Sequence, residues 1–136
     1  MLVLLSGIAI DSNASSFIDV NGDEWYAPYL SAAKNAGIIN GKEDGSFGVG
    51  ENISRQDMVV MAQRTVTLMD KKIIQNNTIQ DFSDEATISD YAKEAIGQMQ
   101  AAGVVSGMGN GCFEPLGNAN RAQAAVVICN LINAMI

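Results

Sequence analysis

Two arginines carry the clearest chemical signal in this 136-residue sequence. Arg55 follows Ser54 and Arg121 follows Asn120, and both preceding residues favour the N-cap position of a helix. A cation in the first turn faces the positive end of the helix dipole, which costs up to about 1 kcal/mol. Because an arginine occurs twice at this unfavourable position, we expect it to have a function. An arginine beside backbone N–H groups at a helix N-terminus suits a carboxylate or a phosphate.

A purely structural role for the two arginines is an equal alternative. In that case each guanidinium pairs with an aspartate of a neighbouring repeat, such as Asp19 or Asp84. Residues 19–23 also resemble the start of a calcium loop, but the match fails at the sixth and twelfth positions, which hold Glu24 and Leu30. We therefore expect neither a metal site nor a cofactor.

The composition narrows the classes of function. The chain has 8 Lys and Arg against 15 Asp and Glu, and this net charge of −7 disfavours nucleic acid and anionic lipid as partners. There is no His, so the usual general base, the common nucleophile pairs and most zinc sites lack their key residue. No apolar run is long enough to insert into a membrane. These features predict a binding module rather than an enzyme.

The two cysteines, Cys112 and Cys129, have a spacing that matches no metal motif. Cys112 lies beside a Gly-rich turn and Cys129 lies in an apolar helical run, where a free Cys behaves as a small hydrophobic residue. We predict two free thiols, with a disulfide as the alternative for an exported protein.

An internal repeat organises the chain. A shift of 66 residues matches Gly, aromatic and Arg positions without a gap from residue 25 to the C-terminus. The matched pairs include Trp25 with Tyr91, Gly37 with Gly103, Gly41 with Gly107, Gly45 with Gly111, Phe47 with Phe113, Asn52 with Asn118 and Arg55 with Arg121. Upstream, Phe17 and Asp19 match Phe82 and Asp84 with a shift of 65.

Each repeat predicts a first helix, a Gly-rich turn and a second helix. The first helix is expected over residues 25–36 and 91–102, where apolar residues recur at helical spacing. Gly37 and Gly103 are expected to cap these helices in a left-handed conformation. Trp25 and Tyr26, near the start, suit the core better than a surface on which a sugar stacks, and both interpretations stay open.

The second helix begins at Ser54 in the central repeat and at Asn120 in the last. Asp57 and Gln123 follow three residues later, which approximates a capping box. The apolar residues that follow predict one buried face on each helix. These residues are Met58, Met61, Ala62, Thr65 and Met69 in the first case, and Ala124, Val127, Ile128 and Leu131 in the second.

The first ten residues are almost all apolar. A signal peptide has a basic residue before its apolar segment, and here no Lys or Arg precedes these residues. They stand before Phe17 as an apolar helix stands before Phe82, so we predict a buried second helix of an earlier, truncated repeat. The predicted division is residues 1–16 for the end of that repeat, 17–80 for a complete repeat and 81–136 for another.

Taken in order, these motifs resemble the S-layer homology family. Its repeat has a Phe-x-Asp opening, Trp-Tyr or Trp-Ala, Ala-Gly-Ile-Ile-x-Gly, Asp-Gly-x-Phe and Ile-Thr-Arg-Ala-Glu. The counterparts are residues 17–19, 25–26, 36–41, 44–47 and 53–57 in the central repeat, and 82–84, 91–92, 102–107, 110–113 and 119–123 in the last. The resemblance covers nearly the whole chain.

The resemblance implies a mainly α fold, with tandem helix-loop-helix repeats packed about a pseudo-threefold axis, a central helical bundle and long loops. It also implies a non-catalytic module at the cell surface or cell wall. Such a module anchors an exported protein by binding secondary cell-wall polysaccharide in grooves between repeats. The group recognised is the carboxylate of a pyruvylated amino sugar, so the glycan is anionic.

The resemblance further assigns roles to particular residues. Arg55 and Arg121 would bind the carboxylate, helped by N–H groups of the helix ends that Ser54 and Asn120 cap. The other assigned residues are Trp25 and its counterpart Tyr91, packed on the sugar, and Asp19 and Asp84, which hydrogen-bond sugar hydroxyls or orient the arginines. The last repeat departs from the pattern at Tyr91, Ala119 and Asn120, and Asp90 and Glu94 add negative charge, so we expect its groove to bind anions less well.

Two functions of other classes remain as alternatives. A self-associating structural module would dimerise or swap a domain to complete the truncated repeat. A glycan hydrolase would need two carboxylates facing each other across a cleft, and the sequence singles out no such pair.

Overall fold

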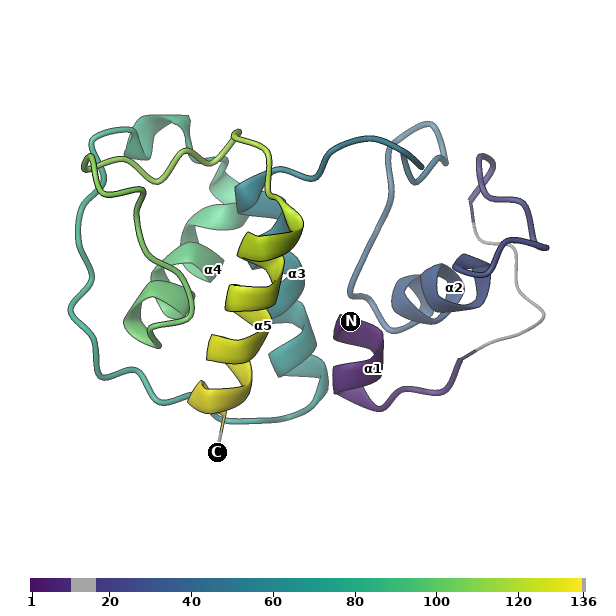
Figure 1. Ribbon diagram of the computed structural model, residues 1–136, viewed down its shortest axis with the longest axis horizontal. Coiled ribbons are helices and arrows are strands. Elements are labelled where there is room, and N and C mark those ends of the chain that lie inside the picture. Colours follow the sequence, from purple (N-terminus) through teal and green to yellow (C-terminus); the bar gives the residue numbers. More distant parts are fainter. Residues whose placement is uncertain (11–16, 136) are drawn as a thin grey trace. The chain divides into compact units, whose positions relative to one another are not determined.

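The computed structural model describes residues 1–10 and 17–135, which form five α-helices and one short 3-10 helix (Figure 1). The helices are α1 (Leu2–Ser6), α2 (Ala27–Asn35), α3 (Arg55–Leu68), η1 (Glu85–Thr87), α4 (Asp90–Ala101) and α5 (Arg121–Ala134). The described residues contain no strand, only isolated bridges between Ser54 and Asn118 and between Ile73 and Met135. The predicted mainly helical fold is confirmed.

The chain divides into two compact units, Met1–Glu51 and Asn52–Ile136, called the first and second unit below. The boundary falls inside the predicted central repeat, just before α3. Helix α3 therefore belongs to the same compact unit as the last repeat. The division into residues 1–16, 17–80 and 81–136 and the pseudo-threefold arrangement stay predictions.

In the first unit, α1 packs against α2. Helix α1 has only five residues and buries only Val3, while Met1 and Leu4 are exposed. Gly7, with a φ of 68°, ends it. The expectation of a buried helix across residues 1–10 is therefore wrong in its extent, and the remainder of the predicted 1–16 segment, residues 11–16, lies outside the described residues.

Helix α2 starts at Ala27, two residues later than predicted, because Pro28 suits the first turn of a helix. Its predicted end is confirmed, since the chain turns at Gly37 with a φ of 80°. Gly103 does the same after α4, with a φ of 72°. Only a residue without a Cβ adopts these left-handed conformations at little cost. The apolar pair Ile38 and Ile39 then enters the core of the first unit.

In the second unit, α3 packs against α4 and α5 (Figure 1). The predicted buried faces are confirmed at Met58, Ala62, Thr65, Val127 and Leu131, which are all buried. The remaining predicted positions, Met61, Met69, Ala124 and Ile128, are half-buried. Burial of such side chains is the main stabilising contribution in a fold of this size.

Each repeat has a Gly-rich loop after its first helix, over residues 37–47 and 103–113, and the two loops are built alike. A tilted aromatic pair closes each one, Phe17 with Phe47 at 5.4 Å and Phe82 with Phe113 at 5.3 Å between ring centroids. A Cβ on the glycine at residue 107 would lie 2.9 Å from the Phe82 ring. The ring therefore packs directly on the backbone, and only Gly permits that approach.

Candidate functional site

Both arginines occupy the first position of a helix, as predicted. The Ser54 side chain accepts a hydrogen bond from the backbone N–H of Asp57 at 3.2 Å, which caps α3. Asn120 forms a complete capping box with Gln123, through a backbone N–H of each residue and the side chain of the other. These caps fix the points at which Arg55 and Arg121 leave their helices.

The Arg55 side chain is held firmly inside the second unit, with 7% of the residue exposed. Its Nε donates to the Phe113 carbonyl at 2.9 Å, and its Nη2 donates to the Ser106 carbonyl at 3.3 Å. The guanidinium also lies 4.8 Å from the centre of the Phe113 ring. Burial lowers the pKa of Arg55, and the carboxylates of Glu114 and Asp84 oppose that shift. An arginine keeps its charge under such conditions.

Asp84 acts on Arg55 through the backbone rather than by direct contact. Its carboxylate accepts from the N–H of Phe113 at 2.9 Å and from the N–H of Glu114 at 2.7 Å. The Phe113 carbonyl is in turn the acceptor for Arg55. No ion pair joins Arg55 to a carboxylate in the described part of the chain, so the alternative of a direct Arg55–Asp84 pair is wrong.

The pKa of Asp84 reflects these contacts. Burial acts to raise it, but the backbone N–H groups of Phe113 and Glu114 and the charge of Arg55 hold it below its ordinary value. The ionised carboxylate is the form that accepts hydrogen bonds from both N–H groups. Asp84 therefore fixes the loop in the shape that receives the arginine.

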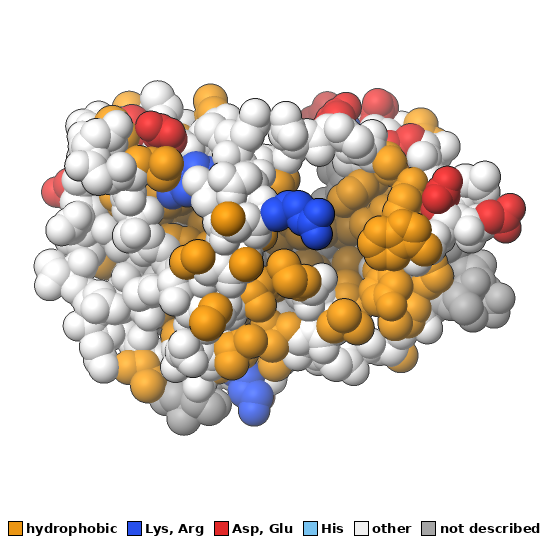
Figure 2. Space-filling view, viewed as in Figure 1, with side chains coloured by type: hydrophobic (Ala, Val, Ile, Leu, Met, Phe, Trp, Pro, Cys, Tyr) orange, Lys and Arg blue, Asp and Glu red, His pale blue; other side chains and the backbone are white. Residues whose placement is uncertain are grey.

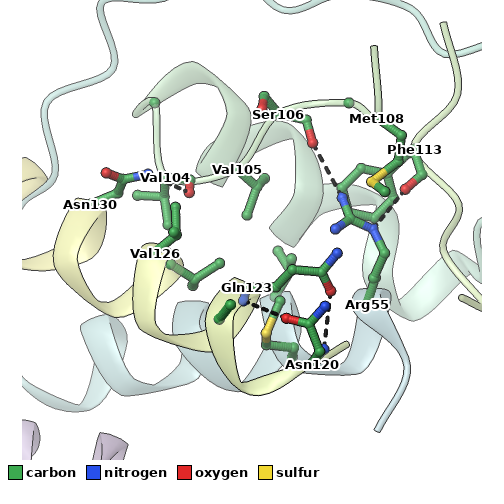
Figure 3. A pocket seen from close by; sticks show the side chains of 16 residues that line it. Arg55, Val104, Val105, Ser106, Met108, Phe113, Asn120, Gln123, Val126 and Asn130 are labelled. Atoms are coloured by element: carbon green, nitrogen blue, oxygen red, sulfur yellow. Dashed lines mark hydrogen bonds between the residues drawn. The ribbon is translucent and has the colours of Figure 1, made fainter. Parts of the chain in front are cut away.

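A pocket of about 370 Å³ opens beside Arg55 (Figure 3). The N-terminal turns of α3, the first half of the Gly-rich loop at residues 103–108, and one side of α5 line it. Its polar lining residues are Arg55, Ser106, Asn120, Gln123 and Asn130, and its apolar ones include Met58, Val105, Met108 and Val126. The pocket thus joins the second helix of the central repeat to the loop and second helix of the last.

The helix end that offers free N–H groups is that of α5, not that of α3. In α3 the N–H of Arg55 donates to the Gly117 carbonyl and that of Gln56 donates to the Pro115 carbonyl. The expectation that N–H groups at this helix end help to bind the ligand is therefore wrong. In α5 the N–H groups of Arg121 and Ala122 have no acceptor among the described residues. Ala122 lines the pocket that contains Arg55.

The second arginine has a different environment. Arg121 is exposed, and no hydrogen bond or ion pair engages its side chain in residues 1–10 and 17–135. It does not line the pocket beside Arg55. The two arginines match in sequence and in helix position, but within the described residues only the Arg55 side chain is held by hydrogen bonds.

Neither Tyr91 nor Ser54 lines the pocket, and Tyr91 lies where α4 begins beside α3. The Tyr91 hydroxyl donates to Asp57 at 2.6 Å and accepts from the Gln56 side chain at 3.1 Å. Burial, followed by the hydrogen bond to Asp57 and its charge, raises the pKa of Tyr91. The tyrosine therefore ties α4 to α3, and ligand binding by Tyr91 and Ser54 stays a prediction.

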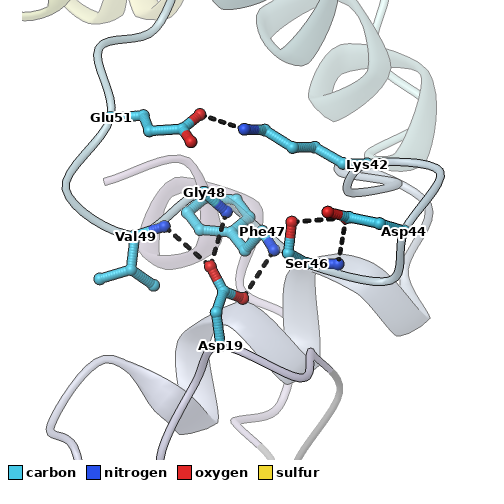
Figure 4. A network of polar contacts seen from close by, with 8 residues as sticks. All are labelled: Asp19, Lys42, Asp44, Ser46, Phe47, Gly48, Val49 and Glu51. Carbon is cyan, nitrogen blue, oxygen red and sulfur yellow. Dashed lines mark hydrogen bonds and ion pairs between the residues drawn. The ribbon is translucent and has the colours of Figure 1, made fainter.

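In the first unit, Asp19 holds its loop as Asp84 holds the equivalent one (Figure 4). Its carboxylate accepts from the backbone N–H groups of Phe47, Gly48 and Val49 at 2.8, 2.8 and 3.0 Å. These bonds, led by the one from Phe47, lower the pKa of Asp19 to about 2. Lys42 of this loop also forms an ion pair with Glu51, which follows the loop.

Trp25 lies just before α2 and is 79% exposed. Its ring meets Tyr26 and Tyr29 edge-on, with centroids 5.6 and 6.4 Å apart. The interpretation of Trp25 as a core residue is therefore wrong. The alternative, a surface on which a sugar stacks, stays a prediction.

Sequence reasoning missed several lining residues. The loop at residues 103–108 was interpreted only as an apolar pair and a turn, and Gln123 only as a cap. Asn130, whose side chain donates to the Val104 carbonyl at 3.3 Å, was not singled out. The repeat itself was the available signal, because it matches this loop, glycine by glycine, with the loop of the central repeat.

The helices, loops and seated arginine define a tandem-repeat binding module. The S-layer homology domain family matches residues 16–59 and 81–125, so the chain belongs to that family. As a member it is a non-catalytic anchoring module of the cell surface or cell wall. The described residues contain no helix long and apolar enough to cross a membrane. Both cysteines are free, as predicted.

Known relatives carry a similar segment within much longer proteins. The chain is 35% identical over 97% of its length to an amylopullulanase of Thermoanaerobacterium thermosulfurigenes, and covers 7% of that protein. It is 32% identical over 97% of its length to exoglucanase XynX of Acetivibrio thermocellus, and covers 12% of it. It is 28% identical over 96% of its length to S-layer protein EA1 of Bacillus anthracis, and covers 15% of it.

Proposed function

We propose that the chain anchors an exported protein to secondary cell-wall polysaccharide, and that the pocket beside Arg55 binds a carboxylate of that glycan. The carboxylate of a pyruvylated amino sugar is the group we expect. One observation carries the proposal: a buried arginine from one repeat and the free N-terminus of a helix from the next border the same pocket.

The Arg55 guanidinium retains donors for a ligand. A guanidinium has five N–H donors, and those on Nε and Nη2 that bond to Phe113 and Ser106 leave three for other acceptors. Its two backbone acceptors and the Phe113 ring fix its orientation before a ligand arrives. Little side-chain entropy is then lost on binding, which favours affinity.

Helix α5 adds a second source of positive potential. It has 14 residues, so its dipole places partial positive charge at the N-terminus, where Ala122 lines the pocket. A carboxylate between this helix end and Arg55 would be attracted from two sides. This arrangement explains how a chain with a net charge of −7 can bind an anionic polymer.

The rest of the pocket suits an uncharged part of a sugar. The side chains of Gln123 and Asn130 supply amide groups for hydroxyls, while Val105 and Val126 supply apolar walls. The volume of about 370 Å³ falls in the range typical of small-ligand sites.

Asp19, Asp84 and Trp25 have supporting roles in this proposal. The two carboxylates already accept backbone hydrogen bonds, which favours positioning of the loops over contact with sugar hydroxyls. The exposed Trp25 ring offers an apolar face for stacking against a sugar. Arg121, being unseated, is expected to contribute less to anion binding than Arg55.

Pelleting with purified cell walls tests the proposal. We expect Arg55→Gln to weaken retention about tenfold or more, and Arg121→Gln to weaken it less. Lys93→Gln is the matched control, since Lys93 is an exposed cation paired with Asp90 on α4. Removal of pyruvate from the walls should weaken the unsubstituted protein and abolish the difference that Arg55→Gln makes. Unchanged pelleting after both treatments would exclude the proposal.

A further inference from the structure

A second pocket lies within the second unit, at the end of α3 away from Arg55. Helices α3 and α4 start together, because the Gln56 side chain near the start of α3 bonds to Ser89, which precedes α4. They run in the same direction, so their C-terminal halves also meet. A pocket of about 350 Å³ opens there, between the second halves of both helices and the segment that follows α3. It contains Lys71 and Lys72 and is called the lysine pocket below.

The lysine pocket is basic although the chain as a whole is acidic. Lys71 and Lys72 line it, and none of its described lining residues is a carboxylate. Asp70 stands next to Lys71 in the chain, and Glu94 accepts a hydrogen bond from the Gln98 side chain at 3.0 Å, but neither carboxylate lines the pocket. Figure 2 shows few basic side chains on the face that it presents, and they lie apart from one another. In a chain with a net charge of −7, two lysines in one pocket point to an anionic ligand.

Both lysines are unpaired within the described part of the chain. Neither ammonium group forms an ion pair or donates a hydrogen bond there. A lysine close to a helix C-terminus often binds the last carbonyls of the helix. In α3 the carbonyls of Val66 and Thr67 already accept the backbone N–H groups of Lys71 and Asp70, at 3.3 and 3.1 Å. The two charges are therefore available to a ligand.

The rest of the lysine pocket suits the uncharged part of a sugar. Its wall contains three glutamines, whose amides both donate to and accept from hydroxyl groups. Gln63 donates to the Thr67 hydroxyl at 3.3 Å and Gln98 donates to Glu94, and both keep a side-chain carbonyl oxygen that meets no donor among the described residues. The apolar lining residues, which can contact the CH groups of a sugar ring, are Val66, Ile73 and Met99.

The lysine pocket is a feature of this chain rather than of the family motif. Apart from Gln98 and Met99, its lining residues lie between the two matched segments, residues 16–59 and 81–125. It shares no lining residue with the pocket beside Arg55. The two pockets adjoin opposite ends of α3, which has 14 residues and is roughly 20 Å long. A ligand in the lysine pocket is therefore not the group that Arg55 binds.

We propose that the lysine pocket is a second saccharide site, which binds a sugar carrying an oxyanion, either a carboxylate or a phosphate. Lys71 and Lys72 attract the oxyanion, and the glutamines bind hydroxyl groups. Because both lysines are exposed, this attraction weakens as salt screens it. The inference rests on the proposed function in one respect, that the sugar belongs to the wall glycan. Two sites on one polymer strengthen retention, because the second binding event is intramolecular.

A nuclear magnetic resonance titration of the ¹⁵N-labelled chain tests the site. The probes are glucuronate, N-acetylglucosamine 1-phosphate and uncharged N-acetylglucosamine. We expect at least one charged probe to shift the amide signals of residues 63–75 and 98–99 more than the uncharged probe does. The charged probe that binds more tightly identifies the oxyanion. No shift at these residues, or equal shifts with all three probes, would overturn the inference.

Paired substitutions separate the lysine pocket from the pocket beside Arg55. Lys71→Gln combined with Lys72→Gln should raise the dissociation constant of the charged probe at residues 63–75 about tenfold or more, and Arg55→Gln should not change it. The matched control is Lys42→Gln combined with Lys93→Gln, which removes two exposed lysine charges elsewhere and should also have no effect. Equal helix content by circular dichroism shows that each variant is folded. Unchanged probe binding by the Lys71 and Lys72 double variant would overturn the inference.

Pelleting with purified cell walls connects the lysine pocket to retention. The Lys71 and Lys72 double variant should be retained severalfold less well than the unsubstituted chain at low salt, and the difference should shrink as salt rises. Full retention of this double variant at low salt would overturn the inference. Normal retention of Arg55→Gln, with charged probes still bound at residues 63–75, would instead count only against the proposed function.

Discussion

The two Gly-rich loops of this chain are the same structure in two different settings. In each, an aspartate near the start of the repeat accepts hydrogen bonds from backbone N–H groups at the end of the loop. The ring pairs Phe17–Phe47 and Phe82–Phe113 have nearly the same separation, 5.4 and 5.3 Å. Since both loops form this way in separate compact units, the residues of a single repeat are sufficient to build the loop.

The loops differ in the cation that meets them. In the second unit Arg55, from the preceding repeat, lies over Phe113. In the first unit Lys34, from α2 itself, lies 4.5 Å from the centre of the Phe17 ring. One repeat therefore supplies the backbone carbonyls and the ring that hold an arginine, and the neighbouring repeat supplies the arginine.

Truncation of the two loop phenylalanines should give the largest difference in stability. Phe113→Ala removes a fully buried ring that packs on Phe82 and Arg55, and should cost about 3–5 kcal/mol in the free energy of unfolding. Phe47→Ala removes a half-buried ring and should cost less. Urea unfolding followed by circular dichroism measures both. Equal costs would show that the arginine adds nothing to the burial of Phe113.

Removal of the aspartate brace should have the next largest effect. Asp84→Asn weakens two charge-assisted hydrogen bonds to the loop and should cost about 1–3 kcal/mol. It should also weaken retention on cell walls, because the Phe113 carbonyl that orients Arg55 loses its support.

The control for that variant is Glu85→Gln, which removes an exposed carboxylate next to Asp84 in the chain. We expect no change in stability or in retention. If the control weakened retention as much as Asp84→Asn, the effect would arise from general charge rather than from the brace.

Much of this arrangement could be predicted because it is local. The matched Gly and aromatic positions follow from backbone conformations and from close packing that few other residues permit. The caps at Ser54 and Asn120 follow from hydrogen bonds spanning three residues. These features gave the correct starts of the second helices and the correct place for both arginines.

The rest depends on contacts across the repeats. Burial of Arg55 requires the carbonyls of Ser106 and Phe113, more than 50 residues further along the chain, which no local pattern encodes. Trp25 was expected in the core because aromatic residues are commonly buried, yet nothing in the first unit covers it. Apolar content likewise overestimated the extent of α1.

The caps of the two second helices should differ in strength. Asn120→Ala removes the 2.8 Å hydrogen bond from the Gln123 N–H to the Asn120 side chain and leaves the reciprocal bond from its own backbone N–H, and it should cost about 1 kcal/mol. Ser54→Ala removes a single hydrogen bond and should cost less, since the first two N–H groups of α3 keep Gly117 and Pro115 as acceptors. Urea unfolding of both variants measures the difference. A larger cost for Ser54→Ala would contradict the assigned caps.

The smallest expected effect is the acid sensitivity contributed by Asp19. Its folded-state pKa is about 2, below the ordinary value of 3.8, because ionised Asp19 accepts three backbone hydrogen bonds. A carboxyl group with a depressed pKa stabilises the fold fully above pH 4, and that contribution is lost as the pH falls through about 2. Solvent screens this exposed group, which keeps the effect small.

The Asp19→Asn variant should therefore be less stable than the unsubstituted chain at neutral pH, and the two should converge as the pH approaches 2. Urea midpoints at pH 7, 4 and 2.5 measure the convergence. Burial opposes the lowering of the pKa in both aspartates, but it is the largest single cause only in Asp84, whereas in Asp19 the largest cause is the hydrogen bond from Phe47. A difference between the chains that persists unchanged at pH 2.5 would mean that the ionised carboxylate does not brace the loop. The two loops would then be held by different forces despite their matching rings.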